Sequence, residues 1–196
     1  MFTGIVAGVG RITDVEQRDR GLRLTVDAGS VSLADVGLGD SIAVNGVCLT
    51  VIAKTARSFD VDVSEETIDC TVGLGGPGEV NLEKALTLAD RLGGHLVTGH
   101  VDGVGSVVLF ERVGESYLLR IRAPAELAKY IAKKGSVTVQ GTSLTVNRVE
   151  GAEFDINLIP HTLEMTTLRH LTPGAKLNLE VDLVARYVER LLAARE

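Results

Sequence analysis

The chain has little of several residue types that often define a protein class. It contains no Trp, two Cys and only 4% aromatic residues, so aliphatic side chains must build most of its core. Cys48 and Cys70 could in principle pair, but two cysteines supply no disulfide framework, and free thiols are the stronger expectation. His95 and His100 lack the i, i+4 spacing of a zinc-binding helix. We therefore expect no metal site.

The charge and the hydropathy pattern argue against two further classes. The formal net charge is -6, whereas a protein that binds nucleic acid generally carries a basic surface. No apolar run approaches the ~20 residues of a membrane helix, and the N-terminus lacks the pattern of a secretory signal. The expectation is a cytoplasmic protein that binds neither nucleic acid nor membranes.

What the chain does contain is a long internal repeat. The matching segments are Thr3–Gly10 with Thr98–Gly105, Ser41–Val51 with Ser136–Val146, Phe59–Val61 with Phe154–Ile156, and Asn81–Glu83 with Asn178–Glu180. Solenoids use short units that are stacked several times, so a single long repeat indicates a duplicated domain instead. Two similar domains can hold two similar ligands.

The hydrophobic pattern within each half predicts short strands. Leu22–Asp27 and Phe59–Val63 alternate apolar and polar residues with period two. Several strands without crossover helices predict an all-β fold with a small antiparallel barrel in each half. Pro124–Lys134 is an exception, because a proline in the first turn and lysines in the last predict a helix that stops at Gly135.

The C-terminal segment lies outside the repeat and predicts a helix. Asp182 can cap this helix, and its apolar residues form one stripe with charged residues on the other side. The stripe consists of Leu183, Val184, Tyr187, Val188, Leu191 and Leu192. Such a helix either docks on its own domain or packs against copies of itself, and the sequence leaves both alternatives open.

The repeated strands also carry candidate binding groups. Asn45–Thr50 places small polar side chains beside a glycine, where a planar ligand could approach the backbone closely. Ser64–Thr67 and Ile159–Thr162 each look like the start of a helical turn, whose N–H groups suit the carbonyl edge of a heterocycle. Each signal alone is weak: a cysteine such as Cys48 is more often a small buried hydrophobe than a nucleophile.

Six segments together carry a resemblance to a known family. They are Met1–Val6, Asn45–Val51, Gly93–Val101, Lys134–Ser136, Gly141–Val146 and Ile159–Glu164. In this order, and with the duplication, they closely resemble riboflavin synthase of the alpha-chain type over essentially the whole chain. The sequence departs from the family pattern at Gln140, where Asp is frequent, and at His161, where an acidic residue is common.

The resemblance implies a fold and an activity. The family fold has two similar six-stranded antiparallel Greek-key barrels with short helices, here domains 1–94 and 95–182, and a C-terminal trimerisation helix, here 183–196. The reaction is a transfer that uses no cofactor. Two molecules of 6,7-dimethyl-8-ribityllumazine exchange a four-carbon unit, which gives riboflavin and 5-amino-6-ribitylaminouracil. The implied partners are this small molecule and two further copies in a homotrimer, while association with a lumazine synthase stays open.

The resemblance also implies two lumazine sites. The first would be lined by Gly4, Ile5, Val6, Cys48, Leu49, Thr50, Asp62, Val63, Ser64, Glu65, Glu66 and Thr67. The second would be lined by Gly99, His100, Val101, Ser143, Leu144, Thr145, Asn157, Leu158, Ile159, Pro160, His161 and Thr162. Lys134 would reach a ligand from an adjacent subunit, because the productive site pairs the N-terminal barrel of one subunit with the C-terminal barrel of a neighbour.

The implied reaction needs a base and groups that position or activate the two substrate molecules. His100 is the candidate general base, since imidazole titrates near neutral pH. Ser41, Cys48 and Phe2 are the candidates in the first domain. Because Ser143 stands where the first half has Cys48, we expect the two sites to react differently with the same ligand.

Two other functions fit parts of the pattern. A non-catalytic lumazine- or flavin-binding antenna protein would share the fold, but it would be expected to lose polar groups in one barrel. Both halves keep theirs here, as Cys48-Leu49-Thr50 and Ser143-Leu144-Thr145. A generic interaction module would not need matched glycines beside matched hydroxyl groups.

Overall fold

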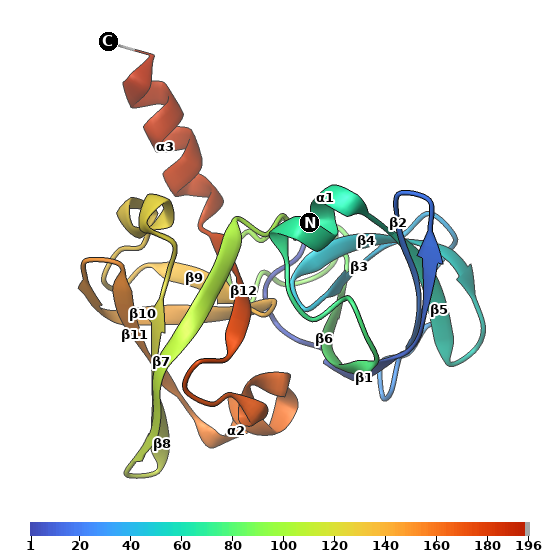
Figure 1. The fold of residues 1–196 in the computed structure, drawn as a ribbon, viewed down its shortest axis with the longest axis horizontal. Helices are drawn as coiled ribbons and strands as arrows, with labels where there is room; N and C mark the ends of the chain where they lie inside the picture. Colours follow the sequence, from blue (N-terminus) through green and yellow to red (C-terminus); the bar gives the residue numbers. More distant parts are fainter. Residues whose placement is uncertain (195–196) are drawn as a thin grey trace.

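The computed structural model describes residues 1–194, and its two halves form two closed β-barrels that lie side by side (Figure 1). The first barrel consists of β1 (Gly8–Arg18), β2 (Gly21–Asp27), β3 (Ser41–Val44), β4 (Val47–Lys54), β5 (Ser58–Ser64) and β6 (Gly78–Lys84). The second consists of β7 (Gly103–Val113), β8 (Ser116–Arg122), β9 (Ser136–Val139), β10 (Thr142–Glu150), β11 (Glu153–Leu158) and β12 (Lys176–Val181). The predicted all-β fold and its duplication are confirmed.

The two barrels share one topology. Hydrogen-bonded neighbours follow the order β1-β2-β5-β4-β3-β6 in the first barrel and the equivalent order β7-β8-β11-β10-β9-β12 in the second. All the pairs are antiparallel, and in each barrel the second strand lies beside the fifth, which makes a Greek key. Even the irregularities repeat, because the bulge after Ile12 on β1 has its counterpart after Val107 on β7.

Each barrel encloses its own aliphatic core. The predicted period-two strands place Leu24 and Phe59 inside the first barrel, where both are fully buried. Leu119 and Phe154 are equally buried in the second barrel. Because side chains alternate across a strand, the intervening positions face outward and remain available for polar contacts.

Short helices follow the strands of both barrels. They are α1 (Glu65–Cys70), the 3-10 helix η1 (Ala125–Tyr130), α2 (Pro160–Met165), the 3-10 helix η2 (Thr167–His170) and α3 (Leu183–Ala193). Ser64 caps α1, since its Oγ accepts a hydrogen bond from the N–H of Thr67 at 3.2 Å. α2 carries Pro160 in its first turn. The predicted helical turns at these two places are therefore confirmed.

The helix predicted over Pro124–Lys134 is wrong in type and extent. Only Ala125–Tyr130 is helical, as a 3-10 helix, and the chain leaves it at Ile131 in an extended conformation. Lys134 has a φ of 68°, a left-handed conformation that no right-handed helix contains. The two lysines therefore lie in a turn after the helix and not in its last turn.

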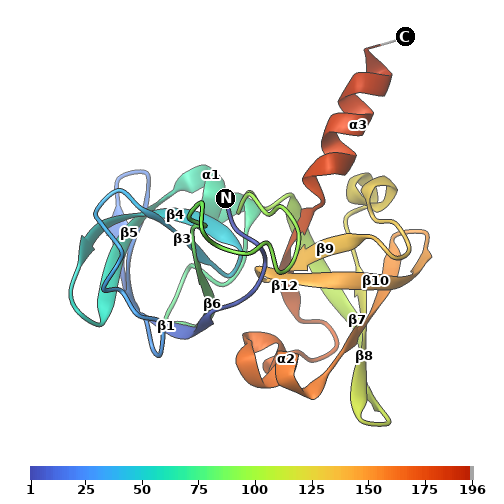
Figure 2. The same cartoon turned by 180° about the vertical axis from the view of Figure 1, so that it is seen from behind.

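Helix α3 projects away from the second barrel (Figures 1 and 2). Asp182 caps it as predicted, with its Oδ1 accepting from the N–H of Val184 at 3.0 Å. Its polar side is tied to its own barrel, where Arg186 pairs with Asp102 and Glu189 contacts both Lys129 and Tyr130. Residues 195 and 196 of the expected segment 183–196 lie outside the described residues.

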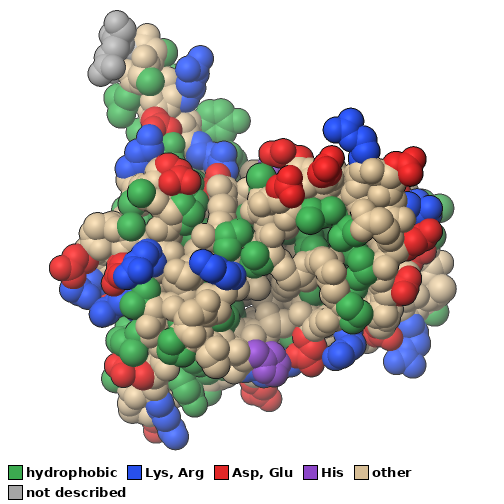
Figure 3. All heavy atoms as spheres, viewed as in Figure 1, with side chains coloured by type: hydrophobic (Ala, Val, Ile, Leu, Met, Phe, Trp, Pro, Cys, Tyr) green, Lys and Arg blue, Asp and Glu red, His purple; other side chains and the backbone are tan. Residues whose placement is uncertain are grey.

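The other side of α3 carries the apolar stripe, and it is exposed. Hydrophobic side chains stand out on this helix in Figure 3. Between 49% and 66% of the surface is exposed for Val184, Tyr187, Val188, Leu191 and Leu192. The helix thus docks on its own barrel through charged groups and leaves its apolar stripe uncovered within the single chain. Among the helices of residues 1–194, none is long and apolar enough to cross a membrane.

The barrels meet through paired contacts that obey an approximate twofold symmetry. Asn81 Nδ2 donates to the carbonyl of Gln140 at 2.8 Å, and Asn178 Nδ2 donates to the carbonyl of Asn45 at 3.1 Å. Between these bonds, Gly46 has a φ of 83°, and a Cβ there would lie 2.7 Å from the nitrogen of Gly141. Only glycine allows this conformation and this close approach.

One buried hydroxyl in the second barrel lacks a partner, which leads to a stability prediction. Thr142 Oγ1 has no hydrogen bond among the described residues, and the first barrel has Val47 at the matching position. We expect Thr142→Val to raise the free energy of unfolding by about 1 kcal/mol, measured by urea denaturation, because it removes an unsatisfied polar group without changing the shape. The same exchange at Thr166, whose hydroxyl donates to the carbonyl of Thr162 at 2.6 Å, should destabilise the protein. A loss of stability in both variants would contradict the prediction.

Candidate functional site

The hairpin formed by β3 and β4 presents polar side chains on the outer face of the first barrel. In its register, Ser41 pairs with Thr50 and Ala43 pairs with Cys48. Paired residues point to the same face, and the intervening Leu49 points into the core. Thr50 is exposed and Cys48 is half-buried. The hairpin thus offers a hydroxyl and a thiol to a ligand outside the barrel.

The hairpin formed by β9 and β10 is its equivalent in the second barrel. Ser136 pairs with Thr145 and Thr138 pairs with Ser143. Thr145 is exposed, Ser143 is half-buried, and Leu144 packs partly against the core. The second hairpin therefore offers hydroxyl groups where the first has Thr50 and a thiol.

The strands next to these hairpins end where the short helices begin. β5 pairs with β4 and ends at Ser64, directly before α1, and β11 pairs with β10 and ends directly before α2. Antiparallel pairing therefore brings each helix start toward the hairpin residues. Ser64, Glu65 and Glu66 are exposed and Thr67 is half-buried. In the second barrel Asn157, Ile159, Pro160 and His161 are exposed and Thr162 is half-buried.

Two of the predicted ligand residues are already engaged on the barrel surface. Asp62 receives hydrogen bonds from Arg23 at 2.7 and 2.9 Å, and this contact lowers the pKa of its carboxyl group. Asn157 Oδ1 accepts from Ser116 Oγ at 2.8 Å. A ligand at either position would have to share these partners.

Four of the predicted site residues lie in hydrophobic cores, which differs from the expectation. Leu49, Val63 and Leu158 are at most 5% exposed, because they occupy the inward positions of their strands. Phe2 is fully buried and packs with Val97, to which its backbone is paired. The side chain of Phe2 is therefore covered by packing contacts within the single chain, and its role in the reaction stays a prediction.

Two buried glutamates, which the sequence analysis missed, hold the segments that precede each barrel. Glu83 Oε1 accepts from both the N–H and the hydroxyl of Thr3 at 2.7 Å, and its Oε2 accepts from the N–H of Gly4 at 3.0 Å. Glu180 makes the same contacts to the N–H and hydroxyl of Thr98 (2.6 and 2.7 Å) and the N–H of Gly99 (2.9 Å). Burial raises the pKa of both carboxyl groups by more than these bonds lower it. The sequence does contain a signal for these two glutamates, because the repeat places a charged residue at matching positions of two strands.

The two anchored segments cross to the opposite barrels. The N–H of Ser143 donates to the carbonyl of Gly4 at 2.7 Å, and the N–H of Cys48 donates to the carbonyl of Gly99 at 2.8 Å. Val101 likewise packs against the core of the first barrel. The structure therefore groups Gly4 with the second hairpin and Gly99 with the first, the reverse of the grouping expected from the sequence. Figure 2 shows the two segments running between the barrels.

The remaining predicted residues lie at different places on the surface. His100 is exposed directly after Gly99, and its N–H donates to Thr98 Oγ1 at 3.3 Å. Ile5 is exposed and Val6 is half-buried. Lys134 is exposed on the second barrel, with its Nζ 3.3 Å from Asn147 Oδ1.

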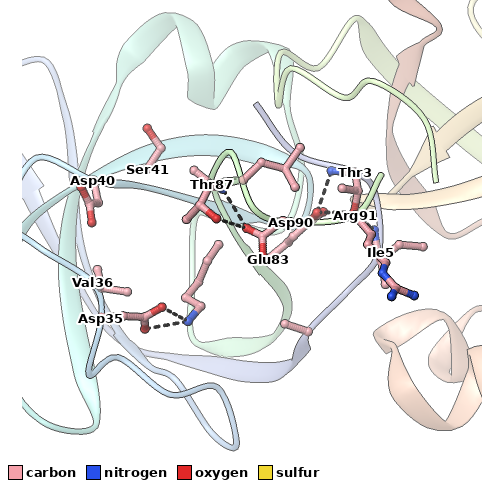
Figure 4. Close-up of a pocket in the computed structure, with 14 residues that line it drawn as sticks. Thr3, Ile5, Asp35, Val36, Asp40, Ser41, Glu83, Thr87, Asp90 and Arg91 are labelled. Atoms are coloured by element: carbon pink, nitrogen blue, oxygen red, sulfur yellow. Dashed lines mark hydrogen bonds and ion pairs between the residues drawn. The ribbon is translucent and has the colours of Figure 1, made fainter. Parts of the chain in front are cut away.

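Ser41 also lines a cavity of about 610 Å³ beside the Thr3–Glu83 contact (Figure 4). Asp35 and Ser41 lie on one side of this cavity, and Thr3 and Arg91 lie on the other. Lys84 in its wall pairs with Asp35 at 2.7 Å. The cavity shows that Ser41 faces an open volume and not a packed interface.

Both cysteines are free thiols. Cys70 at the end of α1 is exposed, and its Sγ donates to Glu66 at 3.4 Å, a contact that raises the pKa of the thiol. This contact disfavours the thiolate, which is the reactive form of cysteine. Across residues 1–194 there is no group of three or more His, Cys, Asp or Glu side chains that could hold a metal ion.

The chain is similar to known proteins over almost its whole length. The family model described as "Lumazine binding domain" matches residues 3–85 and 98–182, one match on each barrel. A riboflavin synthase of Photobacterium phosphoreum is 46% identical over 98% of this chain and 89% of its own length. A riboflavin synthase of Mycobacterium tuberculosis is 48% identical over 98% of both chains. Crystal structures of LumP with 6,7-dimethyl-8-(1'-D-ribityl) lumazine and with riboflavin have TM-scores of 0.79 and 0.80 at 25% and 27% identity, and cover 92% of this chain and 99% of their own.

Proposed function

The chain belongs to the riboflavin synthase family of lumazine-binding proteins, and on that premise we propose that it makes riboflavin from 6,7-dimethyl-8-ribityllumazine. One lumazine gives a four-carbon unit to another, and the products are riboflavin and 5-amino-6-(D-ribitylamino)uracil. The protein is thus a transferase of the last step of riboflavin biosynthesis. The observation that carries this proposal is the pair of equivalent hairpins, with Cys48 and Thr50 on one barrel and Ser143 and Thr145 on the other. Two similar sites suit a reaction between two molecules of one compound.

We assign one lumazine to each hairpin together with the segment that crosses onto it. The first site comprises the outer face of β4, the start of α1 and the segment Gly99–Val101. The second comprises the outer face of β10, the start of α2 and the segment Gly4–Val6. The hydrogen bonds of Cys48 to Gly99 and of Ser143 to Gly4 support this grouping.

The reaction requires a proton to leave the acidic 7-methyl group of one lumazine while a nucleophile adds transiently to the other ring. His100 is the proposed base, because its imidazole is exposed beside the first hairpin and histidine is the side chain most often used for general acid–base catalysis. Cys48 and Ser41 on the same hairpin are proposed to activate or position the ligand. Much of the rate enhancement comes from holding two reactants face to face, which can supply about 7–11 kcal/mol.

The two reactants are proposed to come from different subunits of a homotrimer. The N-terminal barrel of one subunit would face the C-terminal barrel of a neighbour, and the exposed Lys134 would reach across to the ligand. The exposed apolar stripe of α3 supports assembly through this helix. The same proposal divides the chain into domains 1–94 and 95–182 and an assembly helix at 183–196. It also includes a cytoplasmic location and an optional association with a lumazine synthase.

A lumazine-binding protein without turnover is the second candidate function. It is favoured by the likeness to LumP, whose crystal structures contain lumazine, riboflavin or flavin mononucleotide. Against it, both barrels keep the polar hairpin positions at Cys48 and Ser143. The two functions differ in one product, riboflavin.

Incubation of the purified protein with the lumazine alone should therefore produce riboflavin. We expect one riboflavin for each two lumazines consumed, without an added cofactor, measured by absorbance and flavin fluorescence. His100→Gln should slow this turnover about 100-fold, because a general base contributes about 10²–10⁴-fold. Lumazine that stays bound but is not converted would favour the function of a binding protein without turnover. Unchanged turnover in the His100→Gln variant would show that His100 is not the base.

A further inference from the structure

A histidine outside the residues assigned above bridges two hydroxyl groups of the second hairpin. His95 Nδ1 lies 2.7 Å from Ser143 Oγ, and its Nε2 lies 3.3 Å from Thr138 Oγ1. Ser143 and Thr138 are paired across β9 and β10, so the imidazole joins neighbouring positions on one face. The backbone of His95 is held as well, since its N–H donates to the carbonyl of Thr3 at 3.1 Å.

The matching positions of the first hairpin have no such bridge. Ala43 pairs there with Cys48, and both pack with the buried Phe2 and Val97. Ala43 has no side-chain polar atom that a ring nitrogen could contact. The two hairpins therefore share their shape but differ in the chemistry that covers them.

Ser143 is held from several directions at once. Its N–H donates to the carbonyl of Gly4 at 2.7 Å, while its hydroxyl meets the ring of His95. The backbone passes so closely that a Cβ on Gly94 would lie 2.9 Å from Ser143 Cβ and 3.0 Å from its Oγ. The side chain is nevertheless half-buried and not enclosed. A ligand on the outer face can still contact a hydroxyl group whose position is fixed.

The bridge fits a neutral imidazole. One ring nitrogen then donates and the other accepts, which satisfies both hydroxyl groups in either tautomer. Thr138 is only 1% exposed, so its hydroxyl has no easy access to water. Burial lowers the pKa of His95, with Asp182 acting in the opposite direction, and so favours the neutral ring near pH 7.

We infer that His95 is a positioning residue for the second lumazine site, which holds the Ser143 hydroxyl in one rotamer for the polar edge of the heterocycle. A hydroxyl has one donor and two acceptor positions, so the contact with His95 leaves Ser143 able to bind the ligand as well. This inference rests on the proposed function and deepens it. The second site recognises its lumazine through a fixed hydroxyl, whereas the first presents a thiol in apolar surroundings.

A double-mutant cycle on the full-length protein tests the inference. We expect His95→Leu and Ser143→Ala each to lower kcat/KM for the lumazine about tenfold, and the double variant to be no worse than either. The matched control combines His95→Leu with Cys48→Ala, for which the two effects should multiply because the ring nitrogens of His95 contact Ser143 and Thr138 instead of Cys48. If the losses also multiply in the double variant of His95 and Ser143, His95 does not act through that hydroxyl and the inference fails.

Conservative variants separate positioning from packing. Asn at position 95 can place an amide near the Nδ1 site, whereas Gln places it near the Nε2 site. His95→Asn should therefore recover most of the kcat/KM that His95→Leu loses, and His95→Gln should not. Equal recovery, or recovery that only follows the melting temperature, would assign His95 to packing.

Riboflavin binding gives a readout that does not depend on turnover. Titration of riboflavin, followed by quenching of its fluorescence, should rank the position 95 variants in the same order as kcat/KM. A wild type that makes no riboflavin would defeat the proposed function, and the titrations would still decide the role of His95. An identical riboflavin affinity in all variants would overturn the inference.

Discussion

Replacing Glu180 with alanine is expected to lower the free energy of unfolding by about 3 kcal/mol or more. The carboxylate accepts from the N–H and hydroxyl of Thr98 and from the N–H of Gly99, and each buried donor left without a partner costs about 1–3 kcal/mol. Turnover should fall as well, because Gly99 would no longer be held against Cys48. Urea denaturation together with a riboflavin assay measures both effects.

Glu79 provides a matched control for this substitution. It is an exposed glutamate that pairs with Arg169 at 2.6 Å and His170 at 2.9 Å. Exposed ion pairs contribute about 0–1 kcal/mol, so Glu79→Ala should change stability little. Glu83→Ala should instead resemble Glu180→Ala but disturb the second hairpin, through Gly4 and Ser143. Equal losses of unfolding free energy in the Glu79 and Glu180 variants would show that burial of the carboxylate does not determine its contribution to stability.

The effect of Glu180 on stability should depend on pH with a defined sign. Its pKa in the folded state lies above the ordinary value of 4.5, because burial penalises the charged form. The folded protein then binds the proton more tightly than the unfolded chain, so this contribution to stability is complete at low pH. The difference in unfolding free energy between wild type and Glu180→Ala should therefore narrow as the pH rises through that pKa.

The sequence predicted the barrels well because their determinants are local and occur twice. The alternation around Leu24 and Phe59 is the direct consequence of a strand with one buried face, and the repeat transfers it to the second half. The outward positions of Thr50 and Thr145 follow from the same alternation. By contrast, Pro124–Lys134 has the end residues typical of a helix, but the helix ends at Tyr130 and Ile131 is extended.

The arrangement of the sites could not be predicted, because it depends on contacts between distant residues. Thr3 and Glu83 are 80 positions apart, and Gly4 reaches the second barrel through its carbonyl, which accepts from the N–H of the distant Ser143. The sites implied by the resemblance were divided in the order of the residues along the chain, so Gly4 was expected beside the first hairpin. Nothing in the local sequence around His95 indicates its contact with Ser143, which is 48 positions away.

Deletion of α3 is expected to abolish the proposed trimer and lower turnover at least about 100-fold while both barrels remain folded. The helix contacts its own chain mainly through charged groups, such as Arg186 with Asp102, whereas its stripe is uncovered in the single chain. Exposed apolar patches of this kind mark interaction sites. A site that is shared between subunits loses its approximation of the two lumazines when the subunits separate. Sedimentation and a riboflavin assay on a chain that ends at Asp182 measure both losses.

Two variants of the full-length protein test which side of α3 holds the subunits together. Tyr187→Ser combined with Leu191→Ser changes only the exposed stripe and should dissociate the proposed trimer as the deletion does. Arg186→Ala removes the ion pair to Asp102 and should leave assembly intact, because it weakens only the attachment of the helix to its own barrel. A trimer that survives the deletion would mean that barrel contacts hold the subunits together. In that case the stripe is not the assembly surface, and the shared site must be maintained by the barrels alone.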